Sequence, residues 1–118
     1  MFQIDRQLAQ TRYQRLATQY DYATRRVEPV RRLAIDALGL EPGQRVLDVA
    51  CGTGKSFRLL REAVGPDGVV VGVEQSPEML RRARQRVSAA RWDNVRLVES
   101  SIESADLVGP FDAVLFIY

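Results

Sequence analysis

The segment LDVACGTGKS (residues 47–56) combines small residues with a carboxylate and a lysine. Its final Gly-Lys-Ser is typical of loops that bind phosphate groups through successive backbone N–H groups. Its central Gly-Thr-Gly is typical of the turn that binds a dinucleotide. Asp48, directly before the small residues, points instead to a ligand that carries positive charge. The spacing of these residues distinguishes among the three possibilities.

Neither phosphate-binding motif has the spacing that it needs. A triphosphate-binding loop has a further glycine five positions before its final Gly-Lys-Ser, and that position is Val49, inside an apolar run. The dinucleotide fingerprint ends on a glycine that lets a helix pack closely against a strand, and here that position is Phe57, which would keep the helix away. Asp48 would also repel a pyrophosphate. Both readings are therefore disfavoured.

The segment suits a cofactor with positive charge and no phosphate. S-adenosylmethionine carries a sulfonium, an ammonium and one carboxylate. Small residues at positions 50, 52 and 54 would let the backbone approach its methionine part, and Asp48 would supply negative potential near its cationic groups. Glu74 stands 26 residues after Asp48, at the end of the next predicted strand, where an acceptor-only carboxylate can bind both ribose hydroxyls. These residues predict an S-adenosylmethionine site.

Strands and helices in alternation must position these residues. Apolar and β-branched runs predict strands over residues 45–50, 69–74, 95–99 and 111–118. Helices are predicted within residues 27–38, 55–64 and 77–91, with Gly39 ending the first and Ser76-Pro77 starting the last. This order predicts an α/β fold: a Rossmann-like open parallel sheet with flanking helices in three αβα layers. The loops after the first two strands then meet at the carboxyl edge of the sheet, where such folds bind ligands.

The chain divides into two parts. Residues 1–26 are polar and arginine-rich with intermittent apolar positions, which predicts an N-terminal helical or flap segment. Residues 27–118 form the predicted S-adenosylmethionine-binding domain. A chain of 118 residues is long enough for one hydrophobic core and too short for two.

Composition excludes several kinds of chemistry and partner. With no histidine and one cysteine, zinc sites and histidine-based triads are excluded, and we expect no metal site. The lone cysteine also suits the cytoplasm, where thiols stay reduced. No apolar run reaches the ~20 residues that span a bilayer, so no membrane partner is expected. The net charge is only +2, and the arginines at positions 81, 82, 84, 86 and 91 are spread around a predicted helix, so no nucleic-acid partner is expected.

Five segments together resemble a known family. VLDVACGTG and VVVGVEQSPEML resemble the first two motifs of the class I S-adenosylmethionine-dependent methyltransferases, especially the ubiquinone/menaquinone-methyltransferase-like group. YDYATRRVEP resembles that group's Tyr-Asp entry segment. NVRLVESSIESADL and FDAVLFIY resemble the third and fourth motifs, in the right order. The likeness covers residues 18–118.

The resemblance implies cofactor-binding positions. The loop on the methionine side would comprise Asp48, Ala50, Cys51, Gly52 and Gly54. Cys51 is expected to be a small loop residue rather than a nucleophile, because its motif contains no basic partner. The residues beside ribose and adenine would be Glu74, Gln75, Met79, Ser101 and Ile102, and Tyr20 of the Tyr-Asp pair would contact the cofactor.

Two positions depart from the family's pattern. Ala50 replaces the usual first glycine, which is tolerable if its φ is negative. Ser101 replaces an aspartate that accepts a hydrogen bond from the adenine amino group, and a serine hydroxyl accepts that bond without charge assistance. Ile102 would supply the neighbouring backbone N–H. Both departures predict weaker binding of the same cofactor.

The function predicted from these observations is methyl transfer from S-adenosylmethionine to a small-molecule acceptor, with no catalytic base assigned. The family's sheet normally has seven strands, whereas this sequence ends in or after the fourth. We therefore expect a domain truncated after the fourth strand, whose exposed last strand associates with another copy. One alternative is a catalytically incomplete module for cofactor binding or pairing. The other is a nucleotide-cofactor oxidoreductase.

Overall fold

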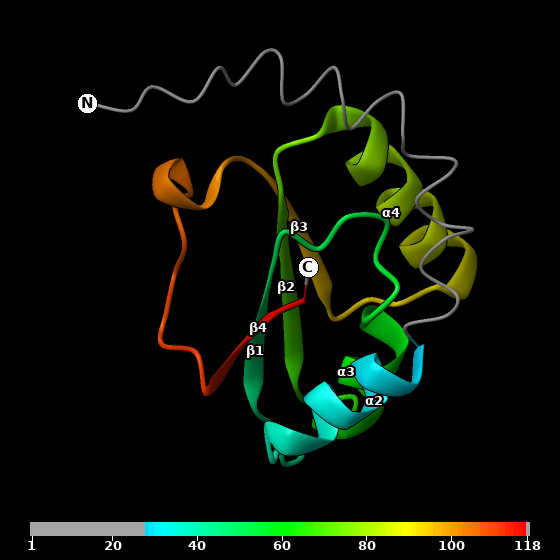
Figure 1. The fold of residues 1–118 in the computed structure, drawn as a ribbon, viewed down its shortest axis with the longest axis vertical. Coiled ribbons are helices and arrows are strands. Elements are labelled where there is room, and N and C mark those ends of the chain that lie inside the picture. Colours follow the sequence, from blue (N-terminus) through cyan, green and yellow to red (C-terminus); the bar gives the residue numbers. More distant parts are fainter. Residues whose placement is uncertain (1–27, 118) are drawn as a thin grey trace.

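The computed structural model describes residues 28–117 (Figure 1), and the predicted N-terminal segment, residues 1–26, lies outside them. Within the described residues, helices and strands alternate as predicted. The strands are β1 (Arg45–Val49), β2 (Val69–Glu74), β3 (Val95–Glu99) and β4 (Ala113–Phe116). The helical elements are α2 (Glu28–Ala37), α3 (Phe57–Val64), α4 (Pro77–Ala90) and the short 3-10 helix η2 (Ile102–Ser104).

The four strands form one parallel sheet in the order β3-β2-β1-β4. Val46 on β1 lies between Val70 on β2 and Ala113 on β4. The chain therefore runs from β1 outward to β3 and then crosses back to β4 on the other side of β1. The direction of winding changes between β1 and β4, and ligands bind outside the carboxyl ends of the strands at such a point. The predicted Rossmann-like parallel sheet is confirmed.

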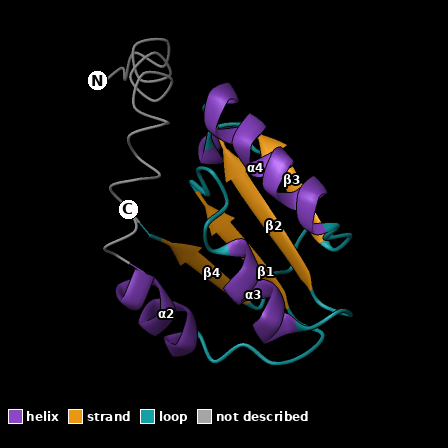
Figure 2. Ribbon diagram, turned by 90° about the vertical axis from the view of Figure 1, so that its right-hand side faces the viewer, coloured by secondary structure: helices purple, strands orange, loops and turns teal. Residues whose placement is uncertain are grey.

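The three α-helices among the described residues lie on one face of the sheet, which Figure 2 views from the helical side. Strand and helix side chains share one core there, including Val46, Val70, Ile35, Leu60 and Leu80. The other face carries a smaller strand cluster of Leu47, Val71 and Val73. Leu107 and Phe111, from the connection between η2 and β4, pack against that cluster. The described residues thus supply two of the three expected layers, the sheet and one layer of helices.

Turn geometry explains where the elements begin and end. Helix α4 begins as predicted, with Pro77 in its first turn and Ser76 Oγ accepting a hydrogen bond from the Met79 N–H at 3.3 Å. Gly39, just after α2, has the left-handed φ of +63° expected of a helix end. Helix α3 was predicted from residue 55 but begins at Phe57, because residues 52–56 form turns in which Gly54 has a φ of +85°. The last strand is shorter than predicted, with β4 covering only Ala113–Phe116.

Phe57 fills the space between the glycine-rich loop and β2. Its side chain is fully buried. A Cβ atom added to Gly72, in the middle of β2, would lie 2.8 Å from the Phe57 ring, and one added to Gly54 would lie 2.5 Å from it. The strand therefore needs glycine at position 72 because no side chain fits beneath the ring. An aromatic ring occupies the position that a dinucleotide-binding turn leaves to glycine, which disfavours the oxidoreductase alternative.

Candidate functional site

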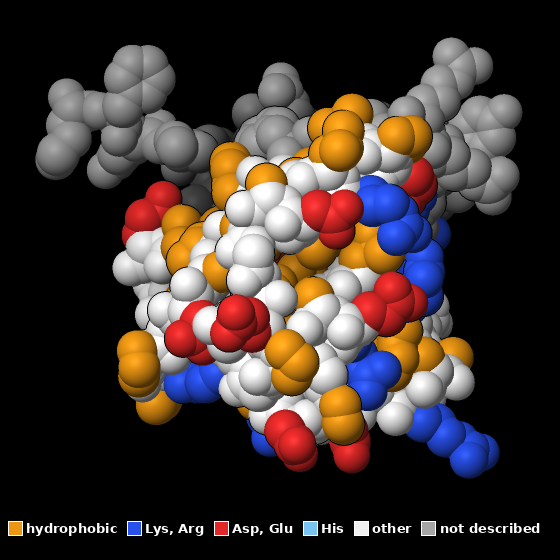
Figure 3. All heavy atoms as spheres, turned by 90° about the horizontal axis from the view of Figure 1, so that it is seen from below, with side chains coloured by type: hydrophobic (Ala, Val, Ile, Leu, Met, Phe, Trp, Pro, Cys, Tyr) orange, Lys and Arg blue, Asp and Glu red, His pale blue; other side chains and the backbone are white. Residues whose placement is uncertain are grey.

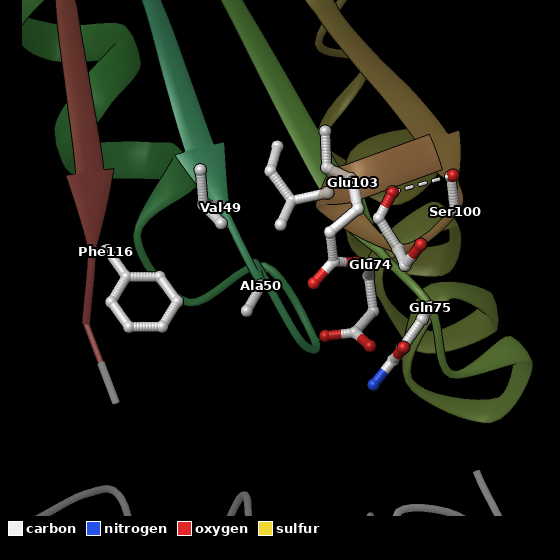
Figure 4. A pocket seen from close by; sticks show the side chains of 10 residues that line it. Val49, Ala50, Glu74, Gln75, Ser100, Glu103 and Phe116 are labelled. Carbon is white, nitrogen blue, oxygen red and sulfur yellow. Dashed lines mark hydrogen bonds between the residues drawn. The ribbon is translucent and has the colours of Figure 1, made fainter. Parts of the chain in front are cut away.

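A cavity of about 140 Å³ lies at the carboxyl edge of the sheet, where the topology predicts a ligand site (Figure 4). Its walls come from the ends of β1, β2 and β4 and from the segment after β3. The lining residues are Val49, Ala50, Val73, Glu74, Gln75, Ser100, Ser101, Ile102, Glu103 and Phe116. Complete ligand pockets typically have ~300–1,000 Å³. These residues can therefore enclose part of a nucleoside cofactor.

Glu74 connects the two loops at the base of this cavity. The residue is 4% exposed, and each carboxylate oxygen accepts one backbone hydrogen bond. Oε1 accepts from the Gly52 N–H at 3.1 Å and Oε2 from the Ser76 N–H at 2.8 Å. A carboxylate oxygen has capacity for a second hydrogen bond. Glu74 thus fixes the loop after β1 to the start of α4 and can still accept from a ligand in the cavity.

Asp48 lies behind the loop and does not line the cavity. It faces the helices, because it alternates along β1 with Leu47 and Val49, which face the opposite cluster. The residue is 4% exposed, and its Oδ2 makes no hydrogen bond to any residue that the structure describes. Burial raises the pKa of Asp48 from an ordinary value of 3.8 to about 7, while the charge of Arg31 lowers it and that of Glu74 raises it. A cationic group nearby would favour the ionised carboxylate.

Ala50 begins the loop with a φ of +55°, so the condition under which alanine would be tolerated here, a negative φ, is not met. The chain turns sharply at this point because the next N–H, that of Cys51, donates to the Val73 carbonyl on β2 at 3.0 Å. Gly52 and Gly54 have φ values of +59° and +85°, which glycine adopts without strain. An alanine in this region costs about 1–2 kcal/mol. Backbone strain is therefore located at a residue that lines the cavity.

Cys51 packs against β2 and does not line the cavity. A Cβ atom added to Gly72 would lie 2.9 Å from its Sγ, so the thiol rests directly on the strand. Burial, followed by the charges of Asp48 and Glu74, raises the pKa of the Cys51 thiol well above its usual range. A thiol that remains protonated is a poor nucleophile. The surroundings of Cys51 support its interpretation as a small loop residue.

The other predicted residues divide into three groups. Gln75, Ser101 and Ile102 line the cavity. Ser101 Oγ is buried and makes no hydrogen bond within the described part of the chain. Met79 is 2% exposed and is not part of the cavity wall. Tyr20 lies outside the described residues.

Sequence reasoning missed half of the lining residues. Val49, Val73 and Phe116 lie at or next to the carboxyl ends of their strands, and this position along the strand was a signal for them. Ser100 and Glu103 follow β3. Glu103 and Glu74 both direct their carboxylates into the cavity (Figure 4). No motif marks Glu103, because its direction depends on how η2 folds back over the sheet.

Residues 28–117 contain no cluster of three or more acidic or cysteine side chains placed to hold a metal ion. In the same part of the chain, no helix has the length and apolar character needed to cross a membrane.

A family model described as a methyltransferase domain matches residues 40–118. The matched region includes all four strands and every residue that lines the cavity. This likeness therefore covers the site as well as the sheet.

Curated relatives carry names that refer to different methyl acceptors. The chain is 35% identical over 88 residues to a demethylmenaquinone methyltransferase of Shouchella clausii, which covers 75% of this chain and 36% of that protein. It is 34% identical over 82 residues to a protein-L-isoaspartate O-methyltransferase of Ignicoccus hospitalis, with coverages of 69% and 39%. It is 42% identical over 84 residues to a 23S rRNA (uracil(1939)-C(5))-methyltransferase of Acinetobacter baumannii, with coverages of 71% and 17%. The chain spans less than half the length of each of these relatives.

Solved structures show the same likeness. A mycolic acid cyclopropane synthase complexed with SAH superposes with a TM-score of 0.63 at 32% identity, covering 75% of this chain and 30% of that one. A protein-L-isoaspartate O-methyltransferase gives a TM-score of 0.61 at 29% identity, with coverages of 71% and 27%. Together with the match over residues 40–118, these similarities show that the chain belongs to the class I S-adenosylmethionine-dependent methyltransferases.

Proposed function

We propose that this chain is the cofactor-binding part of an enzyme that transfers a methyl group from S-adenosylmethionine to a small-molecule acceptor. The main support is Glu74, an acceptor-only side chain that lines the cavity where the winding of the sheet changes direction. A ribose diol offers two hydroxyl donors to such a group. We therefore also propose that the Glu74 carboxylate binds the ribose hydroxyls of the cofactor.

The rest of the cavity suits the remaining parts of the cofactor. Val49, Val73, Ile102 and Phe116 supply apolar surface for an adenine ring. The buried Ser101 hydroxyl, which has no partner among the described residues, can hydrogen-bond to the edge of that ring. The loop from Ala50 to Gly54 would lie along the methionine part, with Asp48 behind it as a source of negative potential.

The bound cofactor would supply an electrophilic methyl group. The residues of this chain would hold it in a fixed direction and exclude water from the cavity. Positioning of this kind can account for a large share of catalysis, so the protein needs no nucleophile of its own. The protonated Cys51 thiol is consistent with such a mechanism.

A small acceptor is favoured over nucleic acid by the arrangement of charge. Arg81 and Arg82 on α4 form ion pairs with Glu78, at 2.6 Å and 3.5 Å. Figure 3 shows the side of the molecule away from the cavity, at the amino ends of the strands, and acidic and basic side chains lie among one another there as well. A continuous basic surface is the usual mark of a nucleic-acid site. The lone cysteine suits a reducing compartment, and we place the protein in the cytoplasm on that basis.

Calorimetric titration tests the cofactor assignment. The purified chain should bind S-adenosylmethionine and S-adenosylhomocysteine and should give no heat with NAD or ATP. Glu74→Ala should weaken binding at least tenfold, because a charge-assisted hydrogen bond to a ligand is lost. Glu78→Ala removes the same kind of side chain from the surface of α4 and should leave affinity unchanged. Binding to NAD or ATP alone would contradict the proposal.

A second candidate function is a module that binds the cofactor or pairs with another chain without catalysing transfer. The exposed side chains of Val114 and Phe116 on β4, at 55% and 57%, favour this candidate. Incubation with methyl-labelled S-adenosylmethionine separates the two functions. Label transferred to small quinone-type acceptors, and not to isoaspartyl peptide or rRNA, supports the enzyme. Binding without transfer supports the module.

A further inference from the structure

Arg31 on α2 is a buried arginine that the proposed site does not yet explain. Its side chain is 7% exposed, although arginine is seldom buried unless it is paired. Nη1 donates a hydrogen bond to Ser56 Oγ at 2.8 Å, and Nε lies 3.2 Å from Glu28 Oε1. Ser56 is the last residue before α3. The guanidinium therefore holds the far end of the glycine-rich loop.

The same guanidinium acts on the other end of this loop. Asp48 precedes the loop and lies on the helical side of the sheet, where α2 also packs. Three charged or titratable groups surround its carboxyl: Arg31 from α2, Glu74 from β2 and the Cys51 thiol from the loop. Arg31 is the cation among them, and its charge opposes the effects of burial and of Glu74. Arg31 thus acts on both ends of the segment from Asp48 to Ser56, through its charge at Asp48 and through its hydrogen bond at Ser56.

We propose that Arg31 is a positioning residue of the cofactor site, which fixes the end of the loop through Ser56 and maintains the negative charge of Asp48 at its start. The inference rests on the proposed function. Cofactor binding then favours the ionised form of Asp48, because the cofactor brings cationic groups near an unpartnered carboxylate oxygen. Helix α2 thereby controls affinity, although it does not line the cavity.

Affinity measured across pH distinguishes this role from a purely structural one. Dissociation constants for S-adenosylmethionine are measured by calorimetry between pH 6 and pH 9 for wild type and Arg31→Gln. The ratio of the two constants cancels the titration of the ligand itself. Without Arg31 the pKa of Asp48 rises, and a rise of about one unit reduces its ionised fraction at pH 7 from about a half to about a tenth. The ratio should then be about fivefold larger at pH 7 than near pH 9, where only the pH-independent loss of the Ser56 contact remains.

Two arginine variants serve as controls. Arg31→Lys keeps the charge at the end of a shorter side chain, so its ratio at pH 7 should lie between those of wild type and Arg31→Gln. Arg86 on α4 also holds the loop, because its Nε donates to the Thr53 carbonyl at 3.0 Å. The charge of Arg86 is not among the causes that shift the pKa of Asp48. Arg86→Gln should therefore weaken binding by the same factor at every pH.

Each outcome either supports or overturns the inference. A loss of affinity in Arg31→Gln that is equal at pH 6, 7 and 9 would mean that Arg31 only supports the fold. Should Arg31→Gln not fold, Arg31→Lys decides the question, since its ratio to wild type must fall as the pH rises. A wild-type protein that binds no S-adenosylmethionine at any pH would instead overturn the proposed function. Failure of the positioning role is thus seen in the pH dependence of the affinity ratio, and failure of the proposed function is seen in the absence of wild-type binding.

Discussion

At the scale of single residues, the two carboxylates at the carboxyl edge of the sheet lie in different surroundings. Both oxygens of Glu74 accept backbone hydrogen bonds, whereas Asp48 Oδ2 has no partner in the described structure. Burial of an unpaired carboxylate is unfavourable, and the raised pKa of Asp48 is the consequence. Asp48 therefore lowers the stability of the folded chain near neutral pH, and a bound cationic cofactor would compensate for this.

The first prediction concerns the pH dependence of stability. The pKa of Asp48 is about 7 in the folded chain and near 3.8 when exposed, so the unfolded chain releases this proton first as the pH rises. The contribution of Asp48 to the free energy of unfolding should fall between pH 4 and pH 7 and then level off, by several kcal/mol in all. Asp48→Asn should remove this slope and stabilise the protein at pH 7, at the expense of cofactor affinity. Urea denaturation at a series of pH values measures the effect, and identical slopes for both proteins would contradict it.

The second prediction concerns the strained turn at Ala50. Glycine adopts a φ of +55° without steric cost, so Ala50→Gly should raise the free energy of unfolding by about 1 kcal/mol. Ala89 is exposed in α4, where the same exchange should lower stability by about 1 kcal/mol because glycine is a poor helix former. Thermal unfolding of the two variants should therefore shift in opposite directions. A shift in the same direction would show that Ala50 is not strained.

At the scale of the elements, the sequence could predict what depends on neighbours along the chain. Strands 69–74 and 95–99 were predicted at their observed bounds, since runs rich in valine lie next to clear turn residues. Ser76-Pro77 marked the start of α4 because capping is a local interaction. Helix α3 was predicted two residues too early, because positive φ values in the preceding turn arise from its bond to β2 and not from its composition.

The residues of the site were likewise predictable only where their place depends on the local sequence or on the order of the strands. Topology places strand ends at one edge, which predicted Glu74 there, and the family resemblance added Gln75 and Ser101, which line the same cavity. The burial of Asp48 and the contact between Arg31 and Ser56 could not be predicted, because they depend on how α2 packs against the loop. The contact between Arg31 and Ser56 joins residues 25 positions apart, and the periodicity of apolar residues along the sequence does not predict such a contact.

At the scale of the whole molecule, the two faces and two edges of the sheet are unequally covered. Among the described residues, helices pack on one face, and the connection through Leu107 and Phe111 covers the other (Figure 1). Within the described residues, β4 pairs with β1 alone and forms one edge of the sheet. Val114 and Phe116 project from this edge strand with more than half of each residue exposed. An apolar edge strand of this kind is a template for pairing with another chain.

The last prediction follows from this edge: the 118-residue chain should self-associate in solution through β4. Val114→Lys places a charge on the edge strand outside the cavity, so it should shift the protein toward monomer without weakening cofactor binding. Val108 is more exposed, at 77%, but lies in the connection before β4, and Val108→Lys should leave association unchanged. Sedimentation velocity over a range of concentrations measures the distribution of species. A wild-type monomer at every concentration, or equal effects of the two lysine variants, would show that the strand edge does not drive association.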